Sequence, residues 1–133
     1  MNLADICWID IPHHDDDRGT LTVLEGSSFP FEIRRIFYMH HIPVGIERGG
    51  HARPYTQQCI ITVAGSFTLD VSDGTATKTF VLEDPNRGLY LPKMIWVRLY
   101  KFHPGTVILV LCDTLYDVQD EIRDFAEFRR RRQ

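Results

Sequence analysis

Short apolar or alternating segments follow one another along most of the chain, separated by turn-forming residues. Runs that are rich in β-branched and aromatic side chains and bounded by Gly, Pro, Asp or Asn are typical of β-strands. Because helical segments do not alternate with these runs, the pattern predicts a β-sandwich or barrel rather than a sheet built from β-α-β units. The expected strands lie within residues 21–24, 31–39, 59–63, 67–71, 77–82, 89–91, 95–102 and 107–111.

Polarity within these runs predicts how some of the strands are placed. Residues 67–71 alternate between apolar and polar, so we expect them to form a hairpin with residues 59–63 that has one solvated face. Residues 77–82 are expected to pair back on the same strand. Residues 107–111 are apolar throughout, which predicts a central strand covered on both faces. The N-terminal residues through Asp17 are expected to contain an edge strand that can pair with a second subunit.

The apolar period changes after residue 113. Apolar side chains then recur at spacings of four, three and three, which is one stripe of an amphipathic helix. Aspartates near the start and four arginines at the end, residues 129–132, suit the helix dipole. We interpret these arginines as a solvated helix end rather than an RNA-binding tail. The stripe consists of Val118, Ile122, Phe125 and Phe128.

Length and charge limit the classes of function. The 133 residues, 1–133, suit one domain with a core of its own. Eighteen acidic and 15 basic residues give a net charge of −3, so no overall basic field is present to hold nucleic acid or an anionic membrane. An anionic ligand would therefore need a local cluster of arginines.

The cysteines and the N-terminus bear on location. Cys7, Cys59 and Cys112 are odd in number and far apart, which predicts buried free thiols in a reducing compartment. The chain shows neither a signal-peptide pattern nor an apolar run of membrane-spanning length. We therefore expect a cytoplasmic protein.

The six histidines do not suggest a metal site. None of them forms an i, i+2 pair, the spacing that lets one strand present two ligands to a metal. Position 53, two residues after His51, is an arginine, which stays protonated and cannot ligate. We expect no catalytic metal.

His51 is nevertheless the strongest candidate for chemistry. It follows Gly49 and Gly50, which permit backbone bends or the close approach of a ligand. On an extended strand His51, Arg53 and Tyr55 would share a face. An isolated histidine is often structural, and the residues alone leave both interpretations open.

Residues 95–102 form a second candidate, because Trp96 and Arg98 belong to a face that mixes aromatic rings with a guanidinium. That face is either an outer surface packed by other elements or a platform for a base, sugar and phosphate. Arg34 and Arg35 pose a related choice, since one of two neighbours on a strand must face inward, where a buried arginine needs a partner.

The motifs, taken in order, resemble the cupin-fold sugar 3,4-ketoisomerases that act on dTDP-4-keto-6-deoxyglucose, also described as WxcM-like. The resemblance runs from about Arg18 to Phe128, and RGGHA at residues 48–52 is one of its most specific pieces. The matching segments are Arg18-Gly19-Thr20-Leu21, residues 30–38, Arg48-Gly49-Gly50-His51-Ala52, Gln57-Gln58, Gly65-Ser66-Phe67, residues 92–96, Tyr116-Asp117, Asp120 and residues 122–125.

The resemblance implies an all-β fold, a cupin-type jelly-roll barrel with a short C-terminal helix. It implies a homodimer, often with exchanged N-terminal strands, that needs no metal or organic cofactor. The implied reaction moves a keto group from C4 to C3 of a dTDP-linked 4-keto-6-deoxyhexose through an enediol. Its product, a dTDP-3-keto-6-deoxyhexose, would serve the synthesis of deoxyamino sugars in bacterial surface glycans such as lipopolysaccharide O-antigen.

The resemblance also implies roles for individual residues. His51 would be the base, since a histidine that titrates near neutrality suits a proton shuttle. Tyr38 would line the sugar site as donor or acceptor, and Arg48 would bind the diphosphate. Further substrate-binding residues would be Arg18, Arg35, Arg53, Gln58, Trp96 and Arg98.

The chain departs from the family pattern at two positions. Members typically have HAHK where this chain has His51-Ala52-Arg53-Pro54, and they tend to carry His or Arg where this chain has Val97. Two alternatives therefore stay open beside the ketoisomerase. One is a related epimerase with an altered product, and the other is a non-catalytic cupin that binds a nucleotide sugar.

Overall fold

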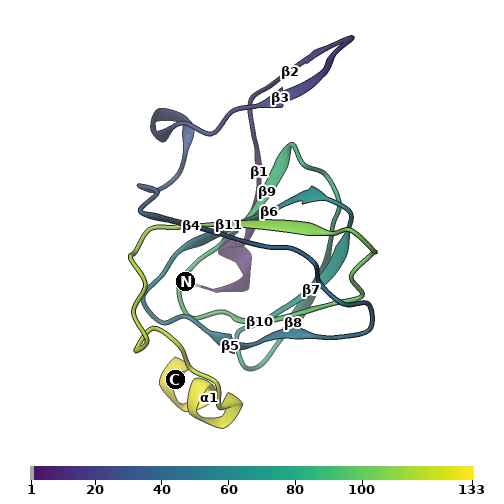
Figure 1. Cartoon of the computed structure of the whole chain (residues 1–133). Coiled ribbons are helices and arrows are strands. Elements are labelled where there is room, and N and C mark those ends of the chain that lie inside the picture. Colours follow the sequence, from purple (N-terminus) through teal and green to yellow (C-terminus); the bar gives the residue numbers. More distant parts are fainter. Residues whose placement is uncertain (1) are drawn as a thin grey trace.

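The computed structural model describes residues 2–133, and its main body consists of two antiparallel β-sheets that face one another (Figure 1). The larger sheet has five strands in the order β1-β9-β6-β11-β4. Strand β11 lies inside it between β6 and β4, which confirms the central position expected for residues 107–111. The bounds are β1 (Cys7–Asp10), β4 (Arg35–Met39), β6 (Gln58–Ala64), β9 (Arg87–Leu91) and β11 (Val107–Cys112).

The second sheet has four strands in the order β5-β10-β7-β8, and a shared core fills the space between the two sheets. Inward-facing side chains such as Leu69 and Ile108 are fully buried in this core. The expected all-β barrel of jelly-roll type is confirmed. The bounds are β5 (Arg48–Ala52), β7 (Phe67–Ser72), β8 (Thr77–Leu82) and β10 (Trp96–Tyr100).

The predicted hairpin between residues 59–63 and 67–71 is wrong, because β6 and β7 belong to different sheets. The turn at Gly65 carries the chain across the core. A Cβ atom there would lie 2.4 Å from the Thr106 hydroxyl oxygen, so the crossing requires glycine. Strand β7 pairs instead with β8, as expected for residues 77–82, and with β10.

The N-terminal region lies partly outside the two sheets. After the 3-10 helix η1 (Leu3–Asp5), β1 forms the edge of the larger sheet beside β9, which confirms the expected edge strand. Strands β2 (His13–Asp16) and β3 (Gly19–Thr22) then form a separate hairpin that projects away from the barrel (Figure 1). Strand β2 was not predicted, because its mostly polar residues carry no apolar alternation. The 3-10 helix η2 (Gly26–Ser28) follows.

The C-terminal helix α1 (Phe125–Arg132) begins later than the apolar stripe predicts. Asp124 caps it by accepting hydrogen bonds from the backbone N–H groups of Ala126 and Glu127. Ile122 cannot be helical, because its N–H and C=O groups both bond to Ala52 at 2.9 Å. The stripe therefore corresponds neither to one helix nor to one buried face: Ile122 is buried outside the helix, whereas Val118 is 68% exposed.

The cysteines are free, and burial raises the pKa of Cys59 to about 12. Cys112 is buried as expected, but the prediction for Cys7 is wrong, since this side chain is exposed on the edge strand β1. Within residues 2–133 no helix is long and apolar enough to span a membrane.

Candidate functional site

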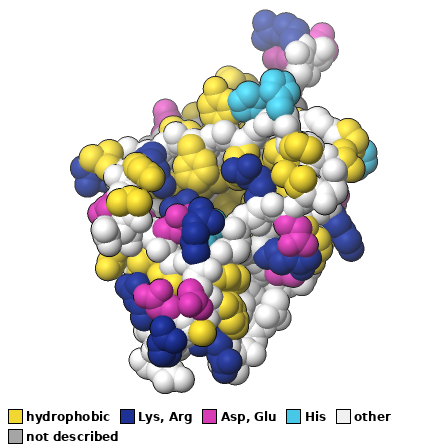
Figure 2. All heavy atoms as spheres, turned by 60° about the horizontal axis from the view of Figure 1, so that its bottom comes forward, with side chains coloured by type: hydrophobic (Ala, Val, Ile, Leu, Met, Phe, Trp, Pro, Cys, Tyr) yellow, Lys and Arg dark blue, Asp and Glu magenta, His cyan; other side chains and the backbone are white. Residues whose placement is uncertain are grey.

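A cavity of about 310 Å³ lies between the two sheets. Strands β4, β6 and β11 form one wall, β5 and β10 form the other, and the segment before α1 contributes Glu121 and Arg123. Figure 2 shows a hollow near the centre of one face, with basic and acidic side chains gathered around hydrophobic surface. The apolar lining consists of Phe37, Met39, Ile60, Val97, Leu99 and Val110.

A glycine bulge in β5 aims two polar residues into this cavity. Gly49 and Gly50 have φ values of +86° and +71°, and the pairing of β5 with β10 shifts register at this point. Without the shift, residues three apart on a strand would face opposite sides. The bulge therefore lets both Arg48 and His51 line the cavity. A Cβ atom on Gly49 would lie 2.8 Å from the Val97 carbonyl oxygen.

The backbone bridge between Ala52 and Ile122 brings further ionisable groups to the same wall. Both of these side chains are buried in a small apolar cluster with Phe128 of α1. Their sequence neighbours must then point the other way, because side chains alternate along extended backbone. The bridge thus places His51 and Arg53 from one segment beside Glu121 and Arg123 from the other.

Asp120 fastens this second segment to the chain after β5. Its side chain is buried and accepts a hydrogen bond from the backbone N–H of Tyr55 at 2.8 Å. The Thr56 hydroxyl donates to its other oxygen and also contacts the Thr114 hydroxyl at 2.6 Å. These contacts fix the position of Glu121, the next residue.

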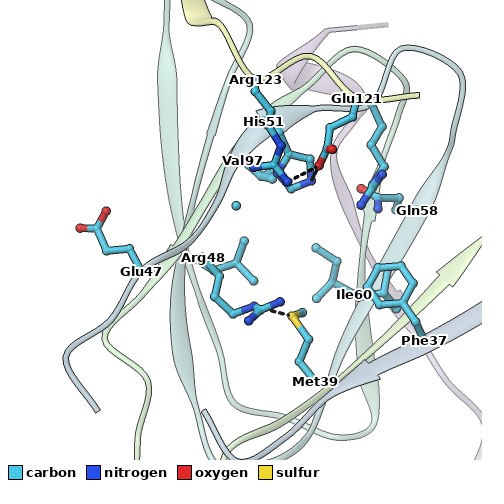
Figure 3. Close-up of a pocket in the computed structure, with 14 residues that line it drawn as sticks. Phe37, Met39, Glu47, Arg48, His51, Gln58, Ile60, Val97, Glu121 and Arg123 are labelled. Atoms are coloured by element: carbon cyan, nitrogen blue, oxygen red, sulfur yellow. Dashed lines mark hydrogen bonds and ion pairs between the residues drawn. The ribbon is translucent and has the colours of Figure 1, made fainter. Parts of the chain in front are cut away.

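His51 and Glu121 point toward one another in Figure 3. The His51 Nε2 atom lies 4.0 Å from Oε1 of Glu121, and the same oxygen is 2.9 Å from Nη2 of Arg123. Burial lowers the pKa of His51 below its ordinary value, and Arg53 lowers it further, while Glu121 acts in the opposite direction. The imidazole is therefore neutral at neutral pH, which is the form that can accept a proton.

Arg48 and Arg53 have few acceptors among the described residues. Arg48 Nε donates to the thioether sulfur of Met39 at 3.1 Å, which is a weak acceptor. Arg53 Nη1 donates to the Asp120 carbonyl oxygen at 3.4 Å, and its buried Nε has no hydrogen-bond partner among the described residues. Guanidinium groups in this state can bind an anionic ligand such as a diphosphate.

The structure brings together four of the residues predicted for the site. His51, Arg48, Arg53 and Gln58 all line the cavity. Arg35 faces the barrel interior on the same side of β4 as the cavity-lining Phe37, but it does not itself line the cavity.

Arg35 has aromatic and sulfur partners. Its Nη2 lies 3.7 Å from Cys112 Sγ, and its guanidinium carbon lies 5.3 Å and 5.6 Å from the ring centroids of Phe37 and Tyr116. The inward arginine of the pair is thus Arg35, and its buried Nε, like that of Arg53, has no hydrogen-bond partner among the described residues.

Four of the residues predicted for the site do not line this cavity in the single chain. Tyr38 is 63% exposed, because strand alternation turns Phe37 and Met39 inward and Tyr38 outward. Alternation likewise puts Trp96 and Arg98 on the outer face of β10. Arg18 lies at the turn of the projecting hairpin and pairs with Asp16 at 3.0 Å.

The outer face of β10 has a structural explanation. Trp96 packs edge-on against Phe125 of α1, with ring centroids 5.1 Å apart. Arg98 forms ion pairs with Glu47 and Asp70. Of the two interpretations that the sequence left open, the outer packing surface is the one observed.

Sequence reasoning missed Phe37, Glu121 and Arg123 as cavity residues. Alternation along residues 31–39 offered two faces but did not show which one turns inward. Glu121 and Arg123 fall in a segment whose period suggested a helix, so their contact with β5 had no visible signal. Within residues 2–133 no group of three His, Cys, Asp or Glu side chains could hold a metal ion.

Comparisons with known proteins identify the family. A family model described as "FdtA: WxcM-like, C-terminal" matches residues 4–133. A curated TDP-4-oxo-6-deoxy-alpha-D-glucose-3,4-oxoisomerase from Aneurinibacillus thermoaerophilus is 30% identical over 116 residues, which span 86% of this chain and 84% of that protein.

Solved structures give the same result. A 3,4-ketoisomerase from Helicobacter canadensis is 34% identical with a TM-score of 0.92, covering 96% of this chain and 97% of that one. A histidine-to-asparagine mutant of the 3,4-ketoisomerase QdtA from Thermoanaerobacterium thermosaccharolyticum, in complex with TDP-4-keto-6-deoxyglucose, is 30% identical with a TM-score of 0.94. The alignment covers 97% of this chain and 94% of that one. The chain therefore belongs to the FdtA, WxcM-like family.

Proposed function

We propose that this chain is a sugar-nucleotide 3,4-ketoisomerase that converts dTDP-4-keto-6-deoxyglucose to a dTDP-3-keto-6-deoxyhexose. The observation that carries the proposal is the placement of a largely buried His51 on the wall of a cavity that also holds arginines with few acceptors. The activities after which the relatives are named, 3,4-oxoisomerase and 3,4-ketoisomerase, support the same reaction.

The reaction needs a base next to the substrate carbon. His51 Nε2 removes the proton from C3, and the C3–H electrons form a C3=C4 double bond while negative charge develops on O4. The imidazolium then returns a proton to C4 as the carbonyl forms at C3. Proton abstraction next to a carbonyl by a positioned histidine is ordinary general acid–base catalysis, and no step uses a metal or organic cofactor.

The arginines of the cavity suit the charged part of the substrate. Arg48 and Arg53 lie on the same wall as His51 and would bind the diphosphate, while Gln58 on β6 would bind the sugar. Arg53 cannot move a proton, but its permanent charge would stabilise the enediolate.

We further propose a homodimer, with the β2–β3 hairpin packed on a second copy. A two-stranded hairpin alone is marginally stable in water, yet this one projects from the barrel with largely exposed side chains. Size-exclusion chromatography with light scattering should give twice the chain mass of 15.5 kDa. A monomer would overturn the proposed dimer but not the proposed reaction.

The free thiols fit a reducing compartment, which is the basis for proposing a cytoplasmic location.

Incubation with dTDP-4-keto-6-deoxyglucose in deuterated water, followed by proton NMR, tests the reaction. The ketoisomerase should produce a 3-keto sugar and replace the C3 hydrogen by deuterium. Exchange with formation of a different 4-keto sugar would instead identify an epimerase. Binding of the substrate without exchange or product would identify a non-catalytic binding protein and overturn the proposal.

A further inference from the structure

The proposed isomerisation relocates two protons rather than one. The carbon-bound proton moves from C3 to C4, which is the part assigned to His51. The hydroxyl proton on O3 must also leave, and O4 must gain one, because the carbonyl and the hydroxyl exchange places. An enzyme that moves both needs a second group able to accept and donate a proton beside the two oxygens.

The cavity wall offers few groups for this second transfer. Its arginines remain protonated at any working pH and cannot shuttle a proton. Tyr38 points out of the barrel, and the neighbouring inward residue, Phe37, has no hydroxyl group. Besides His51, the titratable side chains among the described lining residues are therefore Glu47 and Glu121.

Glu47 is unsuited to act on a ligand in this cavity. Its carboxylate points away from the other labelled groups in Figure 3. It pairs with Arg98 on the outer face of β10, and this hydrogen bond lowers the pKa of Glu47. Glu121, by contrast, faces His51 on the same wall of the cavity.

We propose that Glu121 is a second catalytic residue, whose carboxylate carries the proton from O3 to O4 while His51 carries the proton from C3 to C4. The inference rests on the proposed function and adds to it a residue for the oxygen-to-oxygen transfer. Its basis is the placement of a fixed carboxylate 4.0 Å from His51 Nε2.

The 4.0 Å separation is too long for a direct hydrogen bond but suits a shared ligand. An oxygen atom placed to one side of the line joining the two atoms can lie about 2.8 Å from both, which is the ordinary length of such hydrogen bonds. A sugar hydroxyl in this position would contact Glu121 while the adjacent carbon lies next to His51. The second transfer could then follow the first without movement of the sugar.

Glu121 is also held in place. Arg123 Nη2 contacts its Oε1 at 2.9 Å, Asp120 before it is anchored to Tyr55 and Thr56, and Ile122 after it bonds to the backbone of Ala52. Fixing a catalytic group from both sides reduces the reorganisation needed in the transition state.

The proton balance closes without any further reactant. His51 takes the C3 proton, which gives the enediolate with charge on O4 and a proton still on O3. The Glu121 carboxylate takes the O3 proton and delivers it to O4. As the electrons of the O3–H bond form the C3 carbonyl, the double bond attacks the imidazolium proton, which becomes the C4 hydrogen. Both side chains return to their starting forms.

The experiment compares Glu121→Gln with the wild type in deuterated water, measuring C3 hydrogen exchange and product formation separately. Glutamine keeps the size but cannot accept the O3 proton. Product formation should fall by about 100-fold or more, while C3 exchange, which depends on His51, should fall by less than about 10-fold. Glu83→Gln is the matched control, because Glu83 is exposed beyond β8 and outside the cavity lining.

Several outcomes would overturn the inference. Glu121→Gln could form product at the wild-type rate, or it could lose exchange and product to the same extent, as a binding or folding defect would cause. Neither result removes the proposed function, which fails instead if the wild type itself forms no 3-keto product.

Glu121→Asp keeps the test valid if the glutamine variant does not fold. Aspartate retains a carboxylate, but its side chain is one methylene shorter, so the carboxylate lies further from the sugar. The ratio of exchange to product formation should therefore rise about 10-fold above wild type. An unchanged ratio in a folded aspartate variant would contradict the role of Glu121. Circular dichroism and TDP binding establish that each variant is folded.

Discussion

The inner and outer faces of the β5–β10 strand pair both carry arginines, but their surroundings differ. On the outer face, Arg98 pairs with Glu47 and Asp70, and its guanidinium carbon lies 4.0 Å from the centroid of the Tyr100 ring. On the inner face, Arg53 has one 3.4 Å hydrogen bond to a backbone oxygen and a buried Nε without a partner among the described residues.

This difference is the basis for proposing a ligand-binding role for Arg53 and not for Arg98. Buried polar groups in folded proteins are nearly all hydrogen-bonded, so an exception calls for an explanation. The outer arginine obtains its counter-charges from the chain itself, whereas we propose that the inner arginine binds an anionic ligand. The sequence motifs did not distinguish the two, because each arginine lies among aromatic or polar neighbours.

The largest effect on the inner face is expected when the segment around Asp120, which lies against this face, loses its attachment. Asp120→Ala removes the buried carboxylate that holds Tyr55 and Thr56. It should lower the free energy of unfolding by about 2–4 kcal/mol, because buried donors lose their acceptor. Urea unfolding measures the change, with Asp117→Ala on the exposed part of the segment as the control. A change as small as that of the control would show that Asp120 does not fasten the segment.

Removal of the inner arginine should weaken the binding of the nucleotide. Arg53→Ala is expected to raise the Kd for TDP about 10- to 100-fold, which corresponds to about 1.5–3 kcal/mol for a charge-assisted hydrogen bond. Arg53→Lys should give an intermediate Kd, because lysine keeps the charge but loses the planar fork. Isothermal titration calorimetry measures both. Wild-type affinity for TDP in the alanine variant would show that Arg53 does not bind the ligand.

The pH dependence of activity tests the electrostatics of the same face. Burial and Arg53 lower the pKa of His51, so the low-pH limb of kcat/KM should fall at a pH below 6.5, the ordinary value for histidine. Activity rises with pH through this limb as the imidazole loses its proton. In Arg53→Ala the limb should move up toward 6.5, and in Glu121→Gln it should move further down. Shifts in the opposite directions would contradict the assignment of His51 as the base.

The outer arginine gives the smallest expected effect. Arg98→Ala should leave the Kd for TDP within about 2-fold of wild type, because its partners are carboxylates on the far side of β10 and exposed ion pairs contribute little. A loss of affinity comparable to that of Arg53→Ala would erase the distinction between the two faces.

Much of the fold could be predicted from the sequence, because strand periodicity is a local property. The β7–β8 hairpin and the central position of β11 both follow from local patterns. Strand partners are not local, and the turn at Gly65 looked like a hairpin although it crosses between the sheets. Likewise Ile122 carries a helical period, yet its backbone bonds to Ala52 instead.

The site was predicted in part for a related reason. His51 and Arg48 could be identified because the glycines between them signal an unusual backbone, which the structure shows as a bulge. The outward direction of Tyr38 could not be predicted, because alternation says that Phe37 and Tyr38 face opposite ways, but not which one faces inward. Glu121 could not be found at all, since it approaches His51 only through tertiary contacts far along the chain.

The most direct test of the account is the rate at which the C3 hydrogen of dTDP-4-keto-6-deoxyglucose exchanges in deuterated water with His51→Asn. His103→Asn serves as a matched control, because His103 is exposed and does not line the cavity. Exchange should fall at least about 100-fold in His51→Asn and stay at the wild-type rate in His103→Asn. Wild-type exchange in a folded His51→Asn variant would show that another group removes the proton and would contradict the central claim.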